Sequence, residues 1–82
     1  MGYKNELLDV LDKIHTTTLG IERIQRNMMM QEDVVVWCKQ CIMDIHSVVE
    51  RNGKNYYVVL DDIRITINGY SFTIITAHKL KK

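Results

Sequence analysis

The last third of the chain gathers polar residues of the kinds that hold phosphate groups and move protons. Around the Asn68–Gly69 pair, two runs of alternating apolar and polar residues predict a hairpin with one apolar and one polar face. Metal-free RNA cleavage needs a cation that neutralises the scissile phosphate, and groups that transfer protons at the 2′ and 5′ oxygens. The candidate catalytic residues are Arg64, Tyr57, His46 and Glu50, and the candidate binding residues are Thr66, Ser71, Thr73 and Lys79.

Turn signals divide residues 46–79 into four predicted strands. The Asn52–Gly53 and Asn68–Gly69 pairs each suit a two-residue type I′ turn, and Asp61–Asp62 suits the turn between them. We therefore expect an antiparallel meander with strands over 46–51, 54–60, 63–67 and 70–79. The pairs expected opposite each other at the turns are Arg51 with Lys54, Leu60 with Ile63, and Ile67 with Tyr70.

Alternation assigns one face of this sheet to the core and the other to solvent, because successive strand residues point to opposite sides. The residues expected on the core side are Val49, Tyr56, Val58, Leu60, Ile63, Ile65, Ile67, Tyr70, Phe72 and Ile74. The rows expected on the open side are His46, Val59, Arg64 and Thr73, then Val48, Tyr57, Thr66 and Ser71. Glu50, Asn55 and Lys79 are expected on the same side. By the same parity, His78 points to the helix-covered side unless a bulge reverses it.

The first half of the chain predicts three amphipathic helices. Apolar residues recur at helical spacing over 5–15, and the Thr16–Thr18 triplet offers caps for a second helix that ends near Met28–Met30. Gln31, Glu32 and Asp33 suit the start of a third helix, which runs to about Ile45. The predicted fold is α+β, with three N-terminal helices packed on one face of the four-stranded antiparallel meander.

Length and composition indicate one domain over residues 1–82, with a helical layer over 1–45 and the sheet over 46–80. No apolar run is long enough to cross a bilayer, so we expect a cytoplasmic protein. Cys38 and Cys41 share the apolar stripe of the third helix and make only half of a zinc motif. We therefore expect core thiols, with no metal site and no cofactor.

Charge is distributed unevenly along the chain. Residues 1–45 carry five Lys/Arg and seven Asp/Glu, a net of −2, whereas residues 46–82 carry six and three, a net of +3. Lys81 and Lys82 contribute to that positive half. The second half is therefore compatible with RNA, although it lacks the dense basic stripe of a tight nucleic-acid binder.

Four segments resemble a bacterial family of proteins of about this size that is catalogued as a domain of unknown function. They are HTTTLGIERIQRN (15–27), VVVWCKQ (34–40), RNGKNYYV (51–58) and ITINGYSFTIITAHK (65–79). More loosely, the order of elements and the TINGYSFTIIT hairpin are similar to the barnase, colicin and RelE-type endoribonuclease fold, in which RNA lies on the open face of the sheet. That likeness implies an RNA-directed role for Arg64, Thr66, Ser71 and Thr73.

Three functional hypotheses follow. The first is an RNA-directed protein, endoribonuclease-like or RNA-binding, from a mobile element or toxin system. The second is a non-catalytic protein-interaction module such as an inhibitor, an antitoxin-like partner or an anti-defence protein. The third is a homodimer formed through an apolar patch of Val48, Val59, Ile75 and Ala77. A plain solvated sheet surface, without any site, also fits the polar residues.

Overall fold

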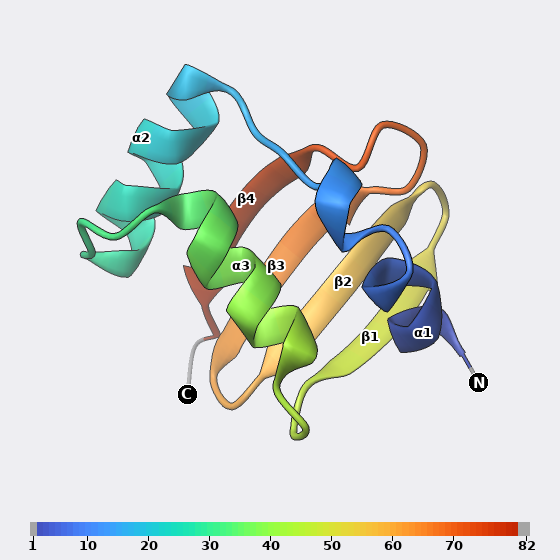
Figure 1. Ribbon diagram of the computed structural model, residues 1–82. Coiled ribbons are helices and arrows are strands. Elements are labelled where there is room, and N and C mark those ends of the chain that lie inside the picture. The colour runs from blue at the N-terminus through green and yellow to red at the C-terminus, as the bar shows by residue number, and fades with distance from the viewer. Residues whose placement is uncertain (1, 81–82) are drawn as a thin grey trace.

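The computed structural model describes residues 2–80 and shows an α+β fold in which helices precede a four-stranded antiparallel sheet (Figure 1). The helical segments are α1 (Tyr3–Leu8), the 3₁₀ turn η1 (Leu11–Lys13), α2 (Thr18–Met28) and α3 (Val34–Met43). The strands are β1 (Val48–Asn52), β2 (Asn55–Leu60), β3 (Ile63–Asn68) and β4 (Ile74–Lys79), in the sheet order β1-β2-β3-β4. Lys81 and Lys82 lie outside the described residues.

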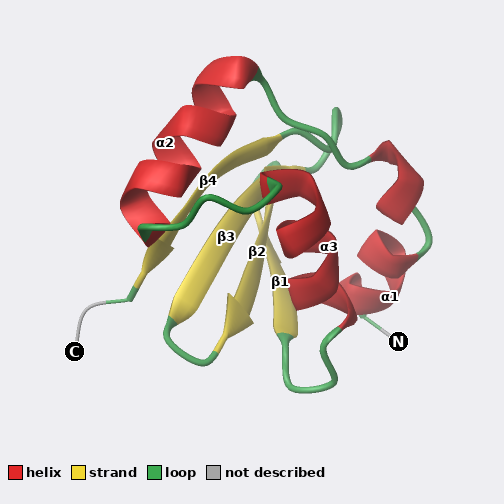
Figure 2. Ribbon diagram, turned by 60° about the vertical axis from the view of Figure 1, so that its left-hand side comes forward, coloured by secondary structure: helices red, strands yellow, loops and turns green. Residues whose placement is uncertain are grey.

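The helices cover one face of the sheet, as predicted. Figures 1 and 2 show α2 running beside β4, α3 crossing the middle of the sheet and α1 lying near β1. The opposite face of the sheet carries no helix in either view. This two-layer arrangement separates a buried apolar surface from an open polar one.

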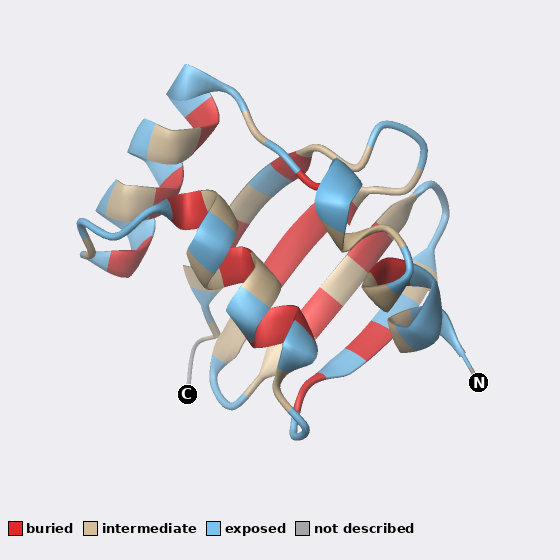
Figure 3. Cartoon of the chain, viewed as in Figure 1, coloured by how far each residue is buried: buried red, intermediate tan, exposed pale blue. Residues whose placement is uncertain are grey.

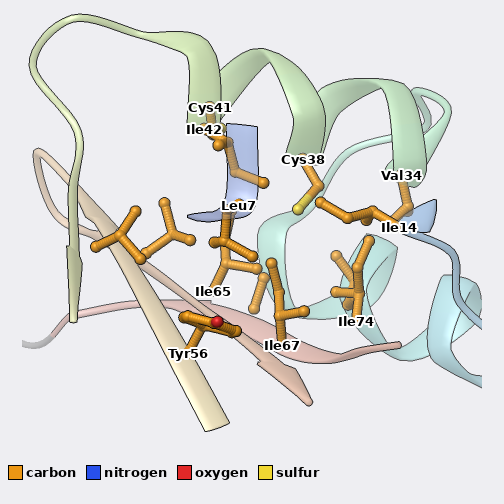
Figure 4. Close-up of a cluster of buried hydrophobic side chains, with 14 of the residues drawn as sticks. Leu7, Ile14, Val34, Cys38, Cys41, Ile42, Tyr56, Ile65, Ile67 and Ile74 are labelled. Carbon is orange, nitrogen blue, oxygen red and sulfur yellow. The ribbon is translucent and has the colours of Figure 1, made fainter. Parts of the chain in front are cut away.

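The core lies between the two layers. Figure 3 shows buried residues along β2 and β3, and Figure 4 shows buried side chains of the helices and the sheet meeting between the layers. The fully buried side chains of largest volume are Leu7, Ile24, Ile42, Ile65, Ile67, Ile74, Val34, Val58 and Cys38. The prediction that Tyr70 faces the core is wrong, because this residue lies in the loop after β3 and 73% of its surface is exposed.

The first helix is shorter than the predicted 5–15 span. It ends at Leu8, and after η1 the chain becomes extended at Ile14. The reason is a tertiary pairing: the His15 N–H donates to the Phe72 carbonyl at 3.2 Å, and the Ile74 N–H donates to the His15 carbonyl at 2.7 Å. These two bonds make a parallel bridge between His15 and Thr73, which a helix through His15 would forbid.

The second and third helices begin at side-chain caps. The Thr17 hydroxyl accepts from the Gly20 N–H at 3.0 Å, and the Asp33 carboxylate accepts from the Val36 N–H at 3.1 Å. Both contacts satisfy backbone donors that the first helical turn leaves free. The third helix ends at Met43 rather than near Ile45, because Asp44 is extended and its carboxylate accepts from the His46 N–H. Ile45 is therefore 84% exposed.

The first three strands keep the predicted faces with one change of register. Leu60 lies opposite Ile63, as expected. At the first hairpin the turn residues are Gly53 and Lys54 instead of Asn52 and Gly53, so Arg51 faces Tyr56 rather than Lys54. A shift of two residues preserves the alternation, and every side chain of β1 stays on its predicted face.

The last strand departs from the prediction in a way that reverses its faces. The β3–β4 connection runs over the five residues 69–73 and is not a two-residue turn, since Ile67 pairs with Ile74. One extra residue, Ile75, then forms a bulge, after which Thr66 faces Thr76 and Arg64 faces His78. His78 is thereby placed on the open side, Ala77 is buried in the core, and Lys79 faces Ile63.

The β1–β2 turn and the β3–β4 loop lie at the same end of the sheet and contact each other. The Gly69 N–H donates to the Lys54 carbonyl at 2.7 Å, and the Arg51 guanidinium lies 4.7 Å above the Tyr56 ring and 5.6 Å above the Tyr70 ring. A Cβ at Gly69 would lie 2.8 Å from that carbonyl oxygen. The loop geometry thus depends on close backbone contact that a larger residue at position 69 would disrupt.

Both cysteines are reduced and belong to the core. Cys38 is completely buried and Cys41 nearly so, on the side of α3 that faces the sheet (Figure 4). Burial raises the pKa of Cys38 to about 12 and that of Cys41 to about 11. Because the thiolate is the reactive form, this environment suppresses redox chemistry and metal binding.

The Thr17 cap generates the first prediction. Thr17→Ala should lower the free energy of unfolding by about 1 kcal/mol, since it removes the acceptor of the Gly20 N–H. Thr18→Ala, the same change one residue later at an exposed position, should change it by less than about 0.5 kcal/mol. Urea denaturation followed by circular dichroism measures both, and equal losses would show that the cap contributes nothing.

The buried thiols generate the second prediction. In the folded protein both cysteines should react with a disulfide reagent far more slowly than in the urea-unfolded chain, and Cys41 should react first. Cys38→Ala and Cys41→Ala assign the two rates. Equal rates in the folded and the unfolded protein would contradict the burial of the thiols.

The same burial makes stability depend on pH. Because the pKa values of both thiols are raised above the ordinary 9.0, the thiols keep their protons to a higher pH in the folded protein than in the unfolded chain. Their contribution to the free energy of unfolding is therefore complete below pH 9 and is lost as the pH rises towards 11 and 12.

Candidate functional site

The open face of the sheet is built from two cross-strand rows, and we use the name open face for these residues. The row nearest the β2–β3 turn is Val48, Val59, Arg64 and His78, and the next row is Glu50, Tyr57, Thr66 and Thr76. Directly opposed strand residues have Cβ atoms roughly 5 Å apart, so neighbours within a row are in reach of one another. Two charged groups, a histidine, a phenol and two hydroxyls therefore share this surface.

Arg64 and Tyr57 form the most specific contact on the open face. The guanidinium carbon of Arg64 lies 5.4 Å from the centre of the Tyr57 ring, a cation–π distance. Arg64 is exposed and Tyr57 is half-buried, while Thr66, which lies opposite Tyr57, is only 8% exposed. The charged group is thus held over an aromatic ring while it remains accessible to solvent.

Of the eight residues predicted for the site, the structure brings four together. Glu50 lies opposite Tyr57, Tyr57 lies opposite Thr66, and Arg64 stacks on Tyr57 across the strands. The four that lie elsewhere are His46, Lys79, Ser71 and Thr73.

His46 is displaced because β1 begins only at Val48. His46 lies in the turn after α3, where its ring nitrogen Nδ1 is 3.3 Å from the Asp44 carboxylate. The backbone N–H of His46 is the main cause that holds the pKa of Asp44 below its usual range. The predicted row of His46, Val59, Arg64 and Thr73 is wrong, since Val48 and His78 occupy its two ends.

Lys79 and His78 exchange the faces that alternation assigned to them. The bulge at Ile75 turns Lys79 to the side of Ile63 and brings His78 opposite Arg64. Thr76 joins the open face for the same reason, and the Asn27 amide of α2 donates to its hydroxyl at 3.5 Å. The sequence carries no separate signal for this bulge, because adjacent apolar residues like Ile74 and Ile75 also occur in β2, at Val58 and Val59, where the register is continuous.

Ser71 and Thr73 lie at the other end of the sheet and form a separate cluster with His15. The Thr73 hydroxyl is 3.1 Å from His15 Nε2 and 2.8 Å from the Ser71 hydroxyl. His15 Nδ1 is 2.9 Å from the Lys13 carbonyl oxygen. Sequence reasoning missed His15, because it assigned that residue to the end of a helix.

Other kinds of site are absent from residues 2–80. No group of three or more His, Cys, Asp or Glu residues is placed to hold a metal ion within this range. The same residues form no pocket. Nor does any of the described helices have the length and apolar character to cross a membrane.

Comparisons with known proteins identify a family and nothing beyond it. Searches of curated proteins and of solved structures found no significant match, so the looser likeness to the endoribonuclease fold is not confirmed. A family model described as "Protein of unknown function (DUF3781)" matches residues 8–78, which include the second and third helices, the first three strands and β4 except for its last residue. The match covers most of the chain, and the protein therefore belongs to the DUF3781 family of proteins of unknown function.

Proposed function

We propose that the protein acts on single-stranded RNA through the open face of its sheet. The observation that carries this proposal is the exposed Arg64 guanidinium stacked 5.4 Å from the Tyr57 ring, on a sheet face that none of the helices in the described part of the chain covers. Sheet surfaces that bind single strands combine a positive charge for the phosphate with planar groups on which bases stack. Arg64 supplies both of these features and Tyr57 supplies the second.

The neighbours of this pair suit an RNA ligand. His78 stands opposite Arg64 and can add a second donor to a phosphate oxygen. The hydroxyls of Tyr57 and Thr76 are donors and acceptors of the kind that bond a ribose 2′-hydroxyl. Glu50, across from Tyr57, repels phosphate and so directs the backbone of the RNA towards the Arg64 and His78 end of the face.

An endoribonuclease-like activity is the stronger form of this proposal. Arg64 would neutralise the scissile phosphate, which makes a metal ion unnecessary for that role. Tyr57 and Glu50 are opposite each other and would transfer the protons, whereas His46 lies in the turn before β1 and has no place in this row. Binding without cleavage requires only the Arg64–Tyr57 pair.

The third prediction tests RNA binding. Arg64→Ala and Tyr57→Ala should each weaken the binding of a fluorescent single-stranded RNA by roughly 5-fold to 150-fold, the range for losing one stacking contact of about 1–3 kcal/mol. Fluorescence anisotropy at fixed salt measures the affinities. Cleavage, if it occurs, should persist in chelator and disappear in Arg64→Ala.

Lys79→Ala is the matched control, because it removes one positive charge from the same sheet but from a residue that faces Ile63. It should weaken binding by less than about threefold, since only general electrostatic attraction is lost. Equal effects of Lys79→Ala and Arg64→Ala would show that net charge alone attracts RNA. No RNA binding by the parent protein would remove the proposed function.

A second candidate function, a non-catalytic protein-interaction module, is favoured by the edge of the sheet. Within residues 2–80, β1 pairs with a strand on one side only, and three exposed apolar residues lie in the segment that ends α3 and begins β1. These residues are Met43, Ile45 and Val48, which are 54%, 84% and 56% exposed. Such an edge can accept a strand from an inhibited or protective partner, or from a second copy of the chain. The previously considered dimer patch is smaller than expected, because Ala77 is buried.

The fourth prediction tests whether two copies of the protein associate through their β1 strands. If β1 edges pair, light scattering over a series of protein concentrations should show a dimer, and Val48→Lys should convert it to a monomer. Thr18→Lys places the same charge on an exposed position of α2 and should leave the dimer intact. A monomer at all concentrations would exclude self-association as the function of this edge.

A further inference from the structure

The cluster of His15, Thr73 and Ser71 is a continuous chain of hydrogen bonds that ends at an exposed hydroxyl. From the backbone outward, the contacts are Lys13 carbonyl to His15 Nδ1 at 2.9 Å, His15 Nε2 to Thr73 Oγ1 at 3.1 Å, and Thr73 Oγ1 to Ser71 Oγ at 2.8 Å. All three side-chain separations are within normal hydrogen-bond range. Neither of the functions proposed above uses this series of hydrogen bonds.

The direction of every proton in the chain follows from one carbonyl group. A carbonyl oxygen only accepts, so Nδ1 of the neutral His15 ring carries the hydrogen and Nε2 has a free electron pair. Thr73 then donates its single hydroxyl hydrogen to Nε2, and its oxygen is left to accept from Ser71. The histidine is thus set as a base that withdraws a proton from Ser71 through Thr73.

The backbone holds these three residues in place. His15 and Thr73 form the parallel bridge, and the Thr16 hydroxyl donates to the Ile74 carbonyl at 2.9 Å beside it. The Ser71 N–H donates to the Asn68 carboxamide oxygen at 2.9 Å. Phe72, between the two hydroxyl residues, has a φ of 59°, a left-handed conformation that is unfavourable for an aromatic residue. Unfavourable backbone of this kind is concentrated at functional sites.

We infer that Ser71 is a nucleophile for acyl transfer from carboxylic esters, with Thr73 as proton relay and His15 as general base. The Ser71 oxygen attacks the ester carbonyl carbon while its proton passes to Thr73 and the Thr73 proton passes to His15 Nε2. A new ester bond to Ser71 forms, the bond from the acyl carbon to the leaving oxygen breaks, and His15 returns the proton to the departing alkoxide or phenoxide. Atoms and charge balance without an oxidant, reductant or metal ion.

The fifth prediction uses p-nitrophenyl acetate as the probe. The folded protein should release p-nitrophenol and gain an acetyl group on Ser71, identified by mass spectrometry of its peptides. Ser71→Ala should remove that adduct. Thr73→Val, which keeps the side-chain shape, and His15→Gln, which keeps hydrogen bonding without a strong base, should each slow acetylation of Ser71 at least tenfold.

Two controls separate an activated serine from general surface reactivity. Thr18→Val makes the same change as Thr73→Val at an exposed site outside the chain of hydrogen bonds, and should leave the rate unchanged. The urea-unfolded parent should lose its preference for Ser71 over lysine and tyrosine side chains. Circular dichroism checks that each variant folds. If a variant does not fold, acetylation of Ser71 in the folded parent protein alone tests the inference.

The inference is overturned if Ser71 stays unmodified in the folded parent. It is also overturned if folded Thr73→Val and His15→Gln react as fast as the parent, which would mean a surface hydrogen-bond network only. Neither result bears on RNA binding, because Arg64 and Tyr57 are in different rows of the sheet from Thr73.

Discussion

The pairing of His15 with the start of β4 is the constraint on which the arrangement of this fold depends. Two backbone hydrogen bonds join an N-terminal segment to a strand more than fifty residues later, as shown by the His15 contacts of Phe72 and Ile74. They stop the first helix, and α2 follows directly and lies beside β4 (Figures 1 and 2). They also occupy the outer edge at the beginning of β4, whereas among residues 2–80 β1, at the other side of the sheet, pairs with β2 alone.

Local patterns were sufficient to predict the layers and most of the core. The alternation of Tyr56, Val58, Ile65 and Ile67 identified the buried face of β2 and β3, because each of these strands has one face against the helices. The Asp61–Asp62 turn also had the expected register, with Asp61 at a φ of 56°. Thr17 and Asp33 capped their helices as their side-chain chemistry indicates.

The last strand and the site residues on it needed information that alternation does not contain. An Asn–Gly pair marks a bend without stating which residue begins it, and here Gly69 starts a longer loop because its N–H bonds to the neighbouring hairpin at Lys54. The bulge at Ile75 then reversed every later side chain. Arg64, Tyr57, Glu50 and Thr66 lie on their predicted face because they precede that bulge, while His78, Thr76 and Lys79 follow it. The position of His15 could not be predicted from local sequence, because it depends on backbone hydrogen bonds with Phe72 and Ile74.

The proposed phosphate contacts lie at the Arg64 end of the open face, and the proposed relay of Ser71, Thr73 and His15 lies beside the β3–β4 loop. The central claim is that RNA contacts the rows that contain Arg64 and Tyr57, with β4 in its reversed orientation. Titration of ¹⁵N-labelled protein with single-stranded RNA, followed by two-dimensional NMR, tests this most directly. The account predicts that the largest chemical-shift changes include Tyr57, Arg64, Thr66, Thr76 and His78, and that α2 and α3 change little. Changes centred on the helices, or none on these residues when RNA binds, would contradict it.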